Sequence, residues 1–139
     1  MSSDDTGGPA ELPVLIHHLA VFAADQAASE RFYSAALAAL GVTVGYRDVE
    51  AAIAEFWPPS NDATSLSVEQ APGPGDVTRG LHVAFTAADR TAVDAFYAAA
   101  LDAGGVSRHA PRHWPEYRAY CAFVSDPDGN NVEAVHKEM

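Results

Sequence analysis

Two histidines and two glutamates recur at one fixed spacing in this sequence. His18 and His82 lie 64 residues apart, and so do Glu69 and Glu133, each of which follows a valine. Imidazole nitrogens and carboxylate oxygens together suit divalent metals such as zinc, nickel, iron, manganese or cobalt. Four such ligands leave one or two coordination positions for substrate or water, which is typical of a catalytic site. The spacing therefore predicts one divalent metal ion per site.

Each of these residue types alone has an ordinary explanation. A single Glu on a strand is usually solvated, and a single His is usually half-buried and hydrogen-bonded. Four residues related by one shift along the chain favour the metal interpretation. His17 is the alternative to His18, but it lies on the opposite face of the expected strand and its repeat counterpart is Leu81. We therefore predict His18 as the ligand.

The same shift of 64 residues reveals an internal repeat. It lays residues 18–42 over residues 82–106 without a gap, and 14 of the 25 positions are identical. Half of the matches are alanines in an alanine-rich chain, but the rest include Asp, Phe, Tyr, Leu and Gly positions. Two copies are too few for a solenoid, which needs three or more units. The repeat therefore predicts one domain with two-fold pseudo-symmetry.

Each copy has the pattern of a short apolar strand, a polar turn and a helix. Phe32 and Phe96 begin apolar stripes with helical spacing, and Gly41 and Gly105 follow the last helical turns. The hairpin-turn signal at residues 126–130 separates the last two strands. Strands are predicted at residues 15–22, 43–47, 54–57 and 65–70, and again at residues 81–86, 106–108, 118–124 and 131–136.

These elements predict an α+β fold of two tandem β-α-β-β-β modules. We expect a flexible lead-in over residues 1–11 and a single domain over residues 12–139. The Pro- and Gly-rich stretch at residues 72–75 divides this domain into a first module, 12–74, and a second module, 75–139.

Composition limits the classes of function. The 139 residues fit one domain, and no stretch is long and apolar enough to cross a bilayer. The net charge of −11 opposes binding to nucleic acid or to anionic lipid, so we expect neither nucleic acid nor membrane as a partner. A secretory signal is not recognisable, which favours a cytoplasmic protein. Cys121 is the only cysteine and is expected to be a buried free thiol.

Several stretches are shared with a known family. They are His18 at the start of the first strand, the Phe32-Tyr33 pair, residues 80–85 and residues 123–135. Through them the segment 14–136 resembles the vicinal oxygen chelate superfamily, which includes glyoxalase I, extradiol dioxygenases, and fosfomycin-resistance and bleomycin-binding proteins.

The resemblance implies a cupped, partly closed sheet around the metal, with the helices outside. It also implies His18, Glu69, His82 and Glu133 as ligands, as in glyoxalase-like members. Dioxygenase-like members use two His and one carboxylate, which would leave Glu69 unused.

A stretch in the second copy has no counterpart of like character in the first. Three of its aromatic residues are expected to stack on a substrate or hydrogen-bond to it: Trp114, Tyr117 and Tyr120. Three basic residues are expected to bind the substrate if it is anionic: Arg112, His113 and Arg118. The alternative is a surface loop packed for stability. In the first copy, Phe56 and Trp57 are expected to form the opposite, apolar wall.

Two classes of function follow. The leading prediction is a metal-dependent enzyme, glyoxalase-like or dioxygenase-like, that chelates neighbouring oxygens of a small substrate, with Glu133 or Glu69 as proton acceptor. The competing prediction is a metal-free binding protein of the drug-sequestering kind, but members of that kind lack the ligand residues. The resemblance also implies a homodimer, in which modules are paired or exchanged between chains.

Overall fold

The structure is a computed structural model that describes residues 14–60 and 63–138. The predicted lead-in at residues 1–11 lies outside this part of the chain. The first module contains β1 (His18–Ala23), α1 (Gln26–Ala38), β2 (Thr43–Asp48), β3 (Ile53–Trp57) and β4 (Ser65–Gln70). A short 3-10 helix, η1 (Pro74–Asp76), follows it. The second module contains β5 (His82–Thr86), α2 (Arg90–Asp102), β6 (Val106–Trp114), the 3-10 helix η2 (Pro115–Tyr117), β7 (Ala119–Ser125) and β8 (Asn131–Lys137).

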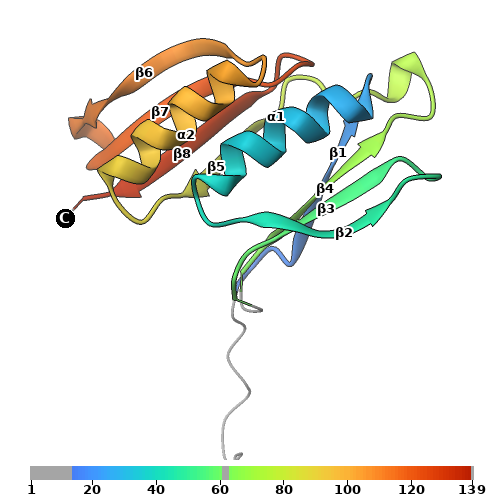
Figure 1. Ribbon diagram of the computed structural model, residues 1–139. Coiled ribbons are helices and arrows are strands. Elements are labelled where there is room, and N and C mark those ends of the chain that lie inside the picture. The colour runs from blue at the N-terminus through green and yellow to red at the C-terminus, as the bar shows by residue number, and fades with distance from the viewer. Residues whose placement is uncertain (1–13, 61–62, 139) are drawn as a thin grey trace, which may run out of the picture.

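The α+β prediction with two tandem β-α-β-β-β modules is confirmed. Each module forms a four-stranded sheet of its own, in the order β1-β4-β3-β2 and β5-β8-β7-β6. The first strand of each module lies at an edge and pairs in parallel with the last strand. The two sheets are separate and are not joined into one closed sheet. Figure 1 shows one sheet beside each helix.

Both helices begin at an aspartate, because a carboxylate can accept the backbone N–H groups that the first helical turn leaves without a partner. Asp25 accepts from the Ala28 N–H at 3.3 Å, and Asp89 accepts from the Ala92 N–H at 2.8 Å. The two caps are related by the repeat. The same local chemistry therefore sets the start of both helices.

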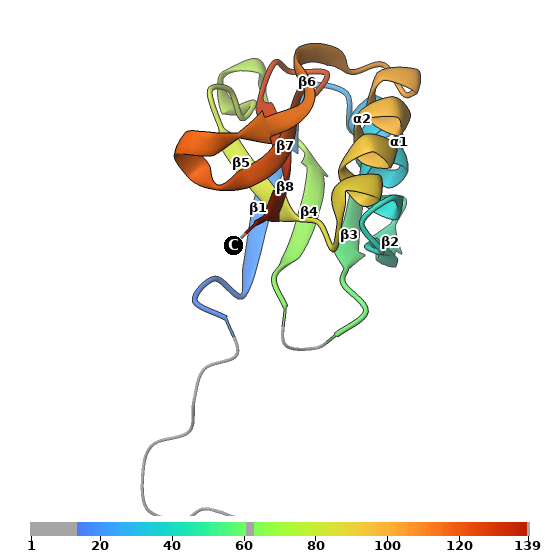
Figure 2. The same ribbon diagram turned by 90° about the vertical axis from the view of Figure 1, so that its left-hand side faces the viewer.

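The modules pack on one another mainly through α1 and α2. The helices lie side by side in Figure 1, and Figure 2 shows them together on one side of the molecule. Phe32 and Phe96 are fully buried within one continuous core that takes residues from both modules. The faces of the two sheets that point away from the helices lie outside this core. We call these the open faces.

The glycines after the helices differ between the modules. Gly41 has the predicted left-handed backbone, with φ +81°, whereas after α2 this conformation belongs to Gly104, with φ +99°. Gly105 has another role, because a Cβ atom there would lie 2.6 Å from Phe32 Cε1 and 2.6 Å from Val124 Cγ1. The close approach of the two modules thus requires glycine at position 105.

The second module departs from the predicted strands at β6. This strand continues to Trp114 instead of ending at Arg108, and its pairing with β7 is interrupted by two irregularities, on either side of His109. The stretch expected to be a loop is therefore mostly a long, bulged edge strand. Bulges bend a strand and redirect its side chains.

Candidate functional site

His82 and Glu133 meet on the open face of the second sheet. Val83 of β5 and Val132 and Ala134 of β8 pack in the core, so alternation along each strand directs His82 and Glu133 to the other face. The His82 Nε2 atom lies 2.8 Å from Glu133 Oε1. The imidazole is 54% exposed and the carboxylate only 11% exposed. The structure thus brings together two of the four predicted ligands.

Cys121 of β7 lies beside this pair. It is a free, buried cysteine, as predicted. Burial and a hydrogen bond to the Glu133 carboxylate raise the pKa of the Cys121 thiol to about 12. The thiol therefore stays protonated at neutral pH and serves as a hydrogen-bond donor to Glu133.

His18 and Glu69 lie on the open face of the first sheet. Together with Ser67, Glu55 and other residues they line a hollow of about 340 Å³. Ser67 Oγ donates a hydrogen bond to Glu69 Oε2 at 2.7 Å, and His18 Nδ1 lies 3.1 Å from His17 Nδ1. His17, the rejected alternative, thus lines the same hollow and contacts His18 directly.

The strand register corrects the predicted equivalence of Glu69 and Glu133. The Ser65 N–H donates to the His17 carbonyl, and the Asn131 N–H donates to the Leu81 carbonyl. His17 and Leu81 are 64 residues apart, but their partners Ser65 and Asn131 are 66 apart. The last strands therefore correspond with a shift of 66.

This shift changes which residues are counterparts. Ser67 stands two positions beyond the partner of His18, as Glu133 stands two positions beyond the partner of His82. Glu69 stands two positions further along β4, where the second module has Val135.

The four predicted ligands are not gathered within one chain. No group of three or more His, Cys, Asp or Glu in residues 14–60 and 63–138 is arranged to hold a metal ion. The donor chemistry nevertheless fits a divalent metal, because an imidazole nitrogen and a carboxylate oxygen face each other at His82 and Glu133. A single chain therefore carries one His–Glu pair on its second sheet and His18 on its first.

Some of the predicted substrate residues lie next to His82. Trp114 packs edge-on to Phe123, with ring centroids 5.4 Å apart, and the Phe123 ring lies 6.0 Å from the His82 ring. Tyr117 is exposed, with its ring centroid 6.3 Å from that of Trp114. The Arg112 guanidinium lies 3.4 Å from the centre of the Trp114 ring. An aromatic wall thus adjoins the His82–Glu133 pair.

Two other predicted substrate residues lie on the helix-facing side of the second sheet. The Tyr120 hydroxyl donates to Asp94 of α2 at 2.8 Å, and Arg90 of α2 lies over its ring. This hydrogen bond raises the pKa of Tyr120. His113 is the cross-strand neighbour of Tyr120 and contacts Glu138 at 2.9 Å. Neither side chain reaches His82. Tyr120 is adjacent in β7 to Cys121, which lies on the open face, and adjacent strand residues point to opposite faces of a sheet.

The remaining predicted substrate residues, Phe56, Trp57 and Arg118, also differ in where they lie. Phe56 is fully buried in the core, so it forms no wall of an open face. Trp57 is 49% exposed on the open face, and its indole N–H donates to Glu55 at 3.2 Å. Its ring lies directly over Gly45, where a Cβ atom would clash with it. Arg118 is exposed after η2, in the left-handed conformation with φ +50°.

Sequence reasoning missed Phe123 and His109 as parts of the aromatic wall. The His109 ring lies 5.2 Å from Trp114 and 5.4 Å from Phe123, centroid to centroid. The alternation along β7 contained a signal for Phe123, since it shares a face with Cys121. His109 carried none, because its direction depends on the irregular pairing of β6.

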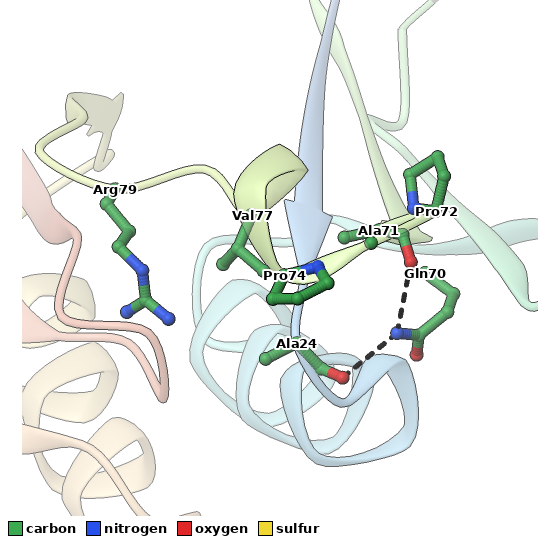
Figure 3. Close-up of a pocket in the computed structure, with 8 residues that line it drawn as sticks. Ala24, Gln70, Ala71, Pro72, Pro74, Val77 and Arg79 are labelled. Carbon is green, nitrogen blue, oxygen red and sulfur yellow. Dashed lines mark hydrogen bonds between the residues drawn. The ribbon is translucent and has the colours of Figure 1, made fainter.

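Another hollow lies at the connector between the modules and contains none of the predicted site residues. It is about 340 Å³ in volume, and Ala24, Gln70, Pro74 and Arg79 are among the residues that line it (Figure 3). The Gln70 side-chain amide already donates to the carbonyls of Ala24 and Ala71. The Arg79 guanidinium donates to the Asp128 carbonyl at 3.4 Å, and the rest of the lining is mostly small or apolar, so this hollow offers little chemistry.

A β-α-β-β-β pair with His and Glu on the open faces defines a class of protein, and the comparison of sequences agrees with it. Residues 15–134 match the sequence profile of the Glyoxalase/Bleomycin resistance protein/Dioxygenase superfamily. The chain belongs to this superfamily. No helix in the described part of the chain has the length and apolar character needed to span a membrane.

Solved structures of the same fold include a glyoxalase/bleomycin resistance protein from Albidiferax ferrireducens T118, with 26% identity and a TM-score of 0.76 over 89% of this chain and 100% of that one. Lactoylglutathione lyase from Agrobacterium tumefaciens has 21% identity and a TM-score of 0.62, over 87% of this chain and 92% of that one. The oxidase ChaP-H2 has 23% identity and a TM-score of 0.61, over 91% and 95%. No curated protein sequence matches the chain significantly.

Proposed function

We propose that this protein is a divalent-metal-dependent enzyme that acts on a small molecule with two neighbouring oxygens. The observation that carries the proposal is the contact between His82 and Glu133 on an open face, beside an aromatic wall. Membership of the superfamily supports it, since its solved structures include proteins named as a lyase and as an oxidase.

The donors in this proposal are His18, His82 and Glu133, with Glu69 as the second predicted carboxylate. A divalent ion bound by such donors supplies Lewis-acid chemistry, which polarises substrate oxygens. The Cys121 thiol orients the Glu133 carboxylate. Trp114 and Phe123 exclude water from one side of the pair and offer ring faces to an apolar part of the substrate. A carboxylate on the open face, Glu133 or Glu69, takes the proton that the reaction releases.

We further propose a homodimer, with one site formed by modules of two chains. His18 lies on the first sheet and His82 on the second, and the two sheets are separate within one chain. Both β1 and β5 are edge strands, and an edge presents backbone N–H and C=O groups to a further strand. A second copy that brings its β5 to β1 would place His82 of the partner subunit near His18.

A metal-free binding protein is the second candidate. The observation that favours it is that one chain gathers only two of the predicted ligands, whereas its aromatic wall is complete. Such a protein would hold an aromatic ligand equally well with and without metal.

Calorimetric titration of nickel, cobalt, zinc, manganese and iron into metal-free protein tests the proposal. We expect about one ion per site with at least one of these metals, and loss of tight binding in His82→Ala and in Glu133→Ala. His113→Ala is the matched control and should retain binding, because His113 lies on the helix-facing side of the second sheet and contacts Glu138. Failure of every metal at micromolar concentrations would reject the metal proposal, and equal losses in all three variants would show that the wrong histidines were chosen.

Turnover separates the enzyme from the binding protein. A panel of 2-oxoaldehydes, catechols and 2-substituted acyl thioesters, followed by mass spectrometry, should contain a substrate for the metal-loaded protein. Glu133→Gln should then lower turnover about 100-fold, because a proton acceptor or metal donor contributes on the order of 3 kcal/mol. If no compound reacts, and a ligand binds equally to the metal-free and the metal-loaded protein, the chain is a metal-free binding protein.

A further inference from the structure

We infer that Glu69 is not a metal ligand, and that Ser67 holds its carboxylate as a hydrogen-bond acceptor for the substrate. The inference rests on the proposed function, because it assigns roles within the same site. It follows from three features of the first sheet, which are the strand register, the Ser67–Glu69 hydrogen bond and the charges in the hollow.

The register places a serine where the second module has its carboxylate. His82 pairs with Asn131, and Glu133 follows two residues later on the same face. In the first module His18 pairs with Ser65, and the residue two positions later on that face is Ser67. A neutral hydroxyl is a much weaker donor to these metals than a carboxylate. The first module therefore contributes its histidine and no carboxylate at the corresponding position.

Glu69 is displaced along β4. Its backbone partner on β1 is Phe22, whereas the partner of His18 is Ser65. A strand rises about 3.3 Å per residue, so the backbone of Glu69 lies about 7 Å further along β4 than that of Ser67, which has the position corresponding to Glu133. Whereas Glu133 contacts His82, the Glu69 carboxylate accepts a hydrogen bond from Ser67.

The hydrogen bond from Ser67 gives the Glu69 carboxylate a definite orientation. The bond is 2.7 Å long, and both side chains line the hollow that also includes His18. An ionised carboxylate has about four acceptor positions, so this bond fixes the group and leaves acceptor capacity for a ligand. Glu69 therefore faces the hollow as an acceptor whose direction is set by Ser67.

The charge of the hollow indicates the chemistry of the ligand group that meets Glu69. Glu55 is the cross-strand neighbour of Ser67 and lines the same hollow, so two carboxylates lie there. Beside Glu69 and Glu55 an anionic ligand group would be repelled, whereas a hydroxyl or an ammonium group can donate to Glu69. We therefore expect the substrate to carry such a donor next to its metal-binding oxygens.

Cobalt titration of the full-length protein decides the ligand assignment, with affinity from calorimetry and coordination from the visible spectrum. Glu69→Gln and Ser67→Ala should bind Co²⁺ within about threefold of the unchanged protein and with the same spectrum, because in this assignment neither side chain is a metal ligand or hydrogen-bonds to one, the two kinds of contact that set metal affinity. Glu133→Gln should weaken Co²⁺ binding by about 100-fold or more. Ser67→Glu should strengthen binding and change the spectrum, because it restores a carboxylate at the corresponding position.

These results separate the inference from the proposed function. If the unchanged protein binds none of the metals, the proposed function fails. If it binds Co²⁺ and Glu69→Gln loses as much affinity as Glu133→Gln, only the present inference is overturned. An unchanged affinity and spectrum in a folded Ser67→Glu protein would overturn the role given to position 67. Circular dichroism of each variant confirms that it is folded.

Catechol, which has two neighbouring hydroxyl groups, tests the acceptor role on the Co²⁺-loaded protein. Glu69→Gln should weaken catechol binding by about tenfold, as loss of a hydrogen bond to a charged group does, without a change in Co²⁺ affinity. Ser67→Ala should have a smaller effect in the same direction. Equal catechol affinity in the three proteins, or no binding to the unchanged one, overturns the acceptor role.

Discussion

The hydroxyl of Tyr33, in the first module, donates a 2.7 Å hydrogen bond to the Asp126 carboxylate, in the turn between β7 and β8 of the second. Tyr33 is fully buried, and burial and the adjacent Asp126 both raise its pKa. Asp126 also accepts from the backbone N–H groups of Asp128 and Asn130. One carboxylate therefore shapes the turn and joins the two modules.

Replacing Tyr33 by Phe should destabilise the protein by about 2 kcal/mol, because a buried hydrogen bond to a charged group is lost. Tyr97 is its repeat counterpart and a matched control, since its hydroxyl donates to Ser107 in an exposed, neutral pair at 2.7 Å. Tyr97→Phe should cost about 0.5 kcal/mol. Urea unfolding of both variants measures the difference, and equal losses would contradict the role given to Asp126.

Gly105→Ala should destabilise the protein by about 1–3 kcal/mol, the usual range for overpacking in a core. The added Cβ would meet Phe32, Val124 and the carbonyl of Ala100, which lies at 2.8 Å, so the modules would have to separate slightly. Gly75→Ala is the control, because nothing lies within 4 Å of a Cβ there. A melting temperature unchanged in both variants would show that the modules are not closely packed at Gly105.

Tyr120→Phe should lower stability by about 1 kcal/mol and leave metal affinity unchanged. Its hydroxyl bonds Asp94 on the helix-facing side and contributes nothing to the open face. Thermal unfolding and cobalt titration of the same preparation check both halves of this expectation. A Tyr120→Phe protein with normal stability and weakened metal or ligand binding would show that Tyr120 belongs to the binding site.

Glu138 should titrate far below an ordinary glutamate. Its pKa is lowered to about 2, chiefly by the hydrogen bonds from Arg90, and further by the contact with His113. Because the pKa is lower in the folded state, Glu138 stabilises the fold above the ordinary value of 4.5, and this contribution is lost as the pH falls from there towards 2. Carboxylate NMR titration measures the pKa directly. In Arg90→Gln the midpoint should rise towards 4.5, and a midpoint that stays near 2 would exclude Arg90 as the main cause.

The sequence was enough to predict the order of the elements and the two-module α+β fold. It was also enough to predict that His82 and Glu133 belong to one site. Helix caps, apolar periodicity and the turn at residues 126–130 are local signals, and His82 and Glu133 lie on adjacent strands of one module. Such features depend on residues close in sequence or within one repeat. The shared pattern of two copies was therefore enough to predict them.

The counterpart of Glu133 and the separation of the two sheets were decided only by the tertiary structure. A strand has a side-chain period of two, so a slip of two residues leaves every side chain on the same face and the apolar pattern unchanged. The 64-residue shift came from the first strand and the helix of each copy and carried no information about how the last strand pairs, so it matched Glu69 with Glu133 where the backbone hydrogen bonds match Ser67. Likewise, the packing of α1 on α2 depends on the shapes of Phe32, Gly105 and their neighbours across the modules, which no local pattern contains.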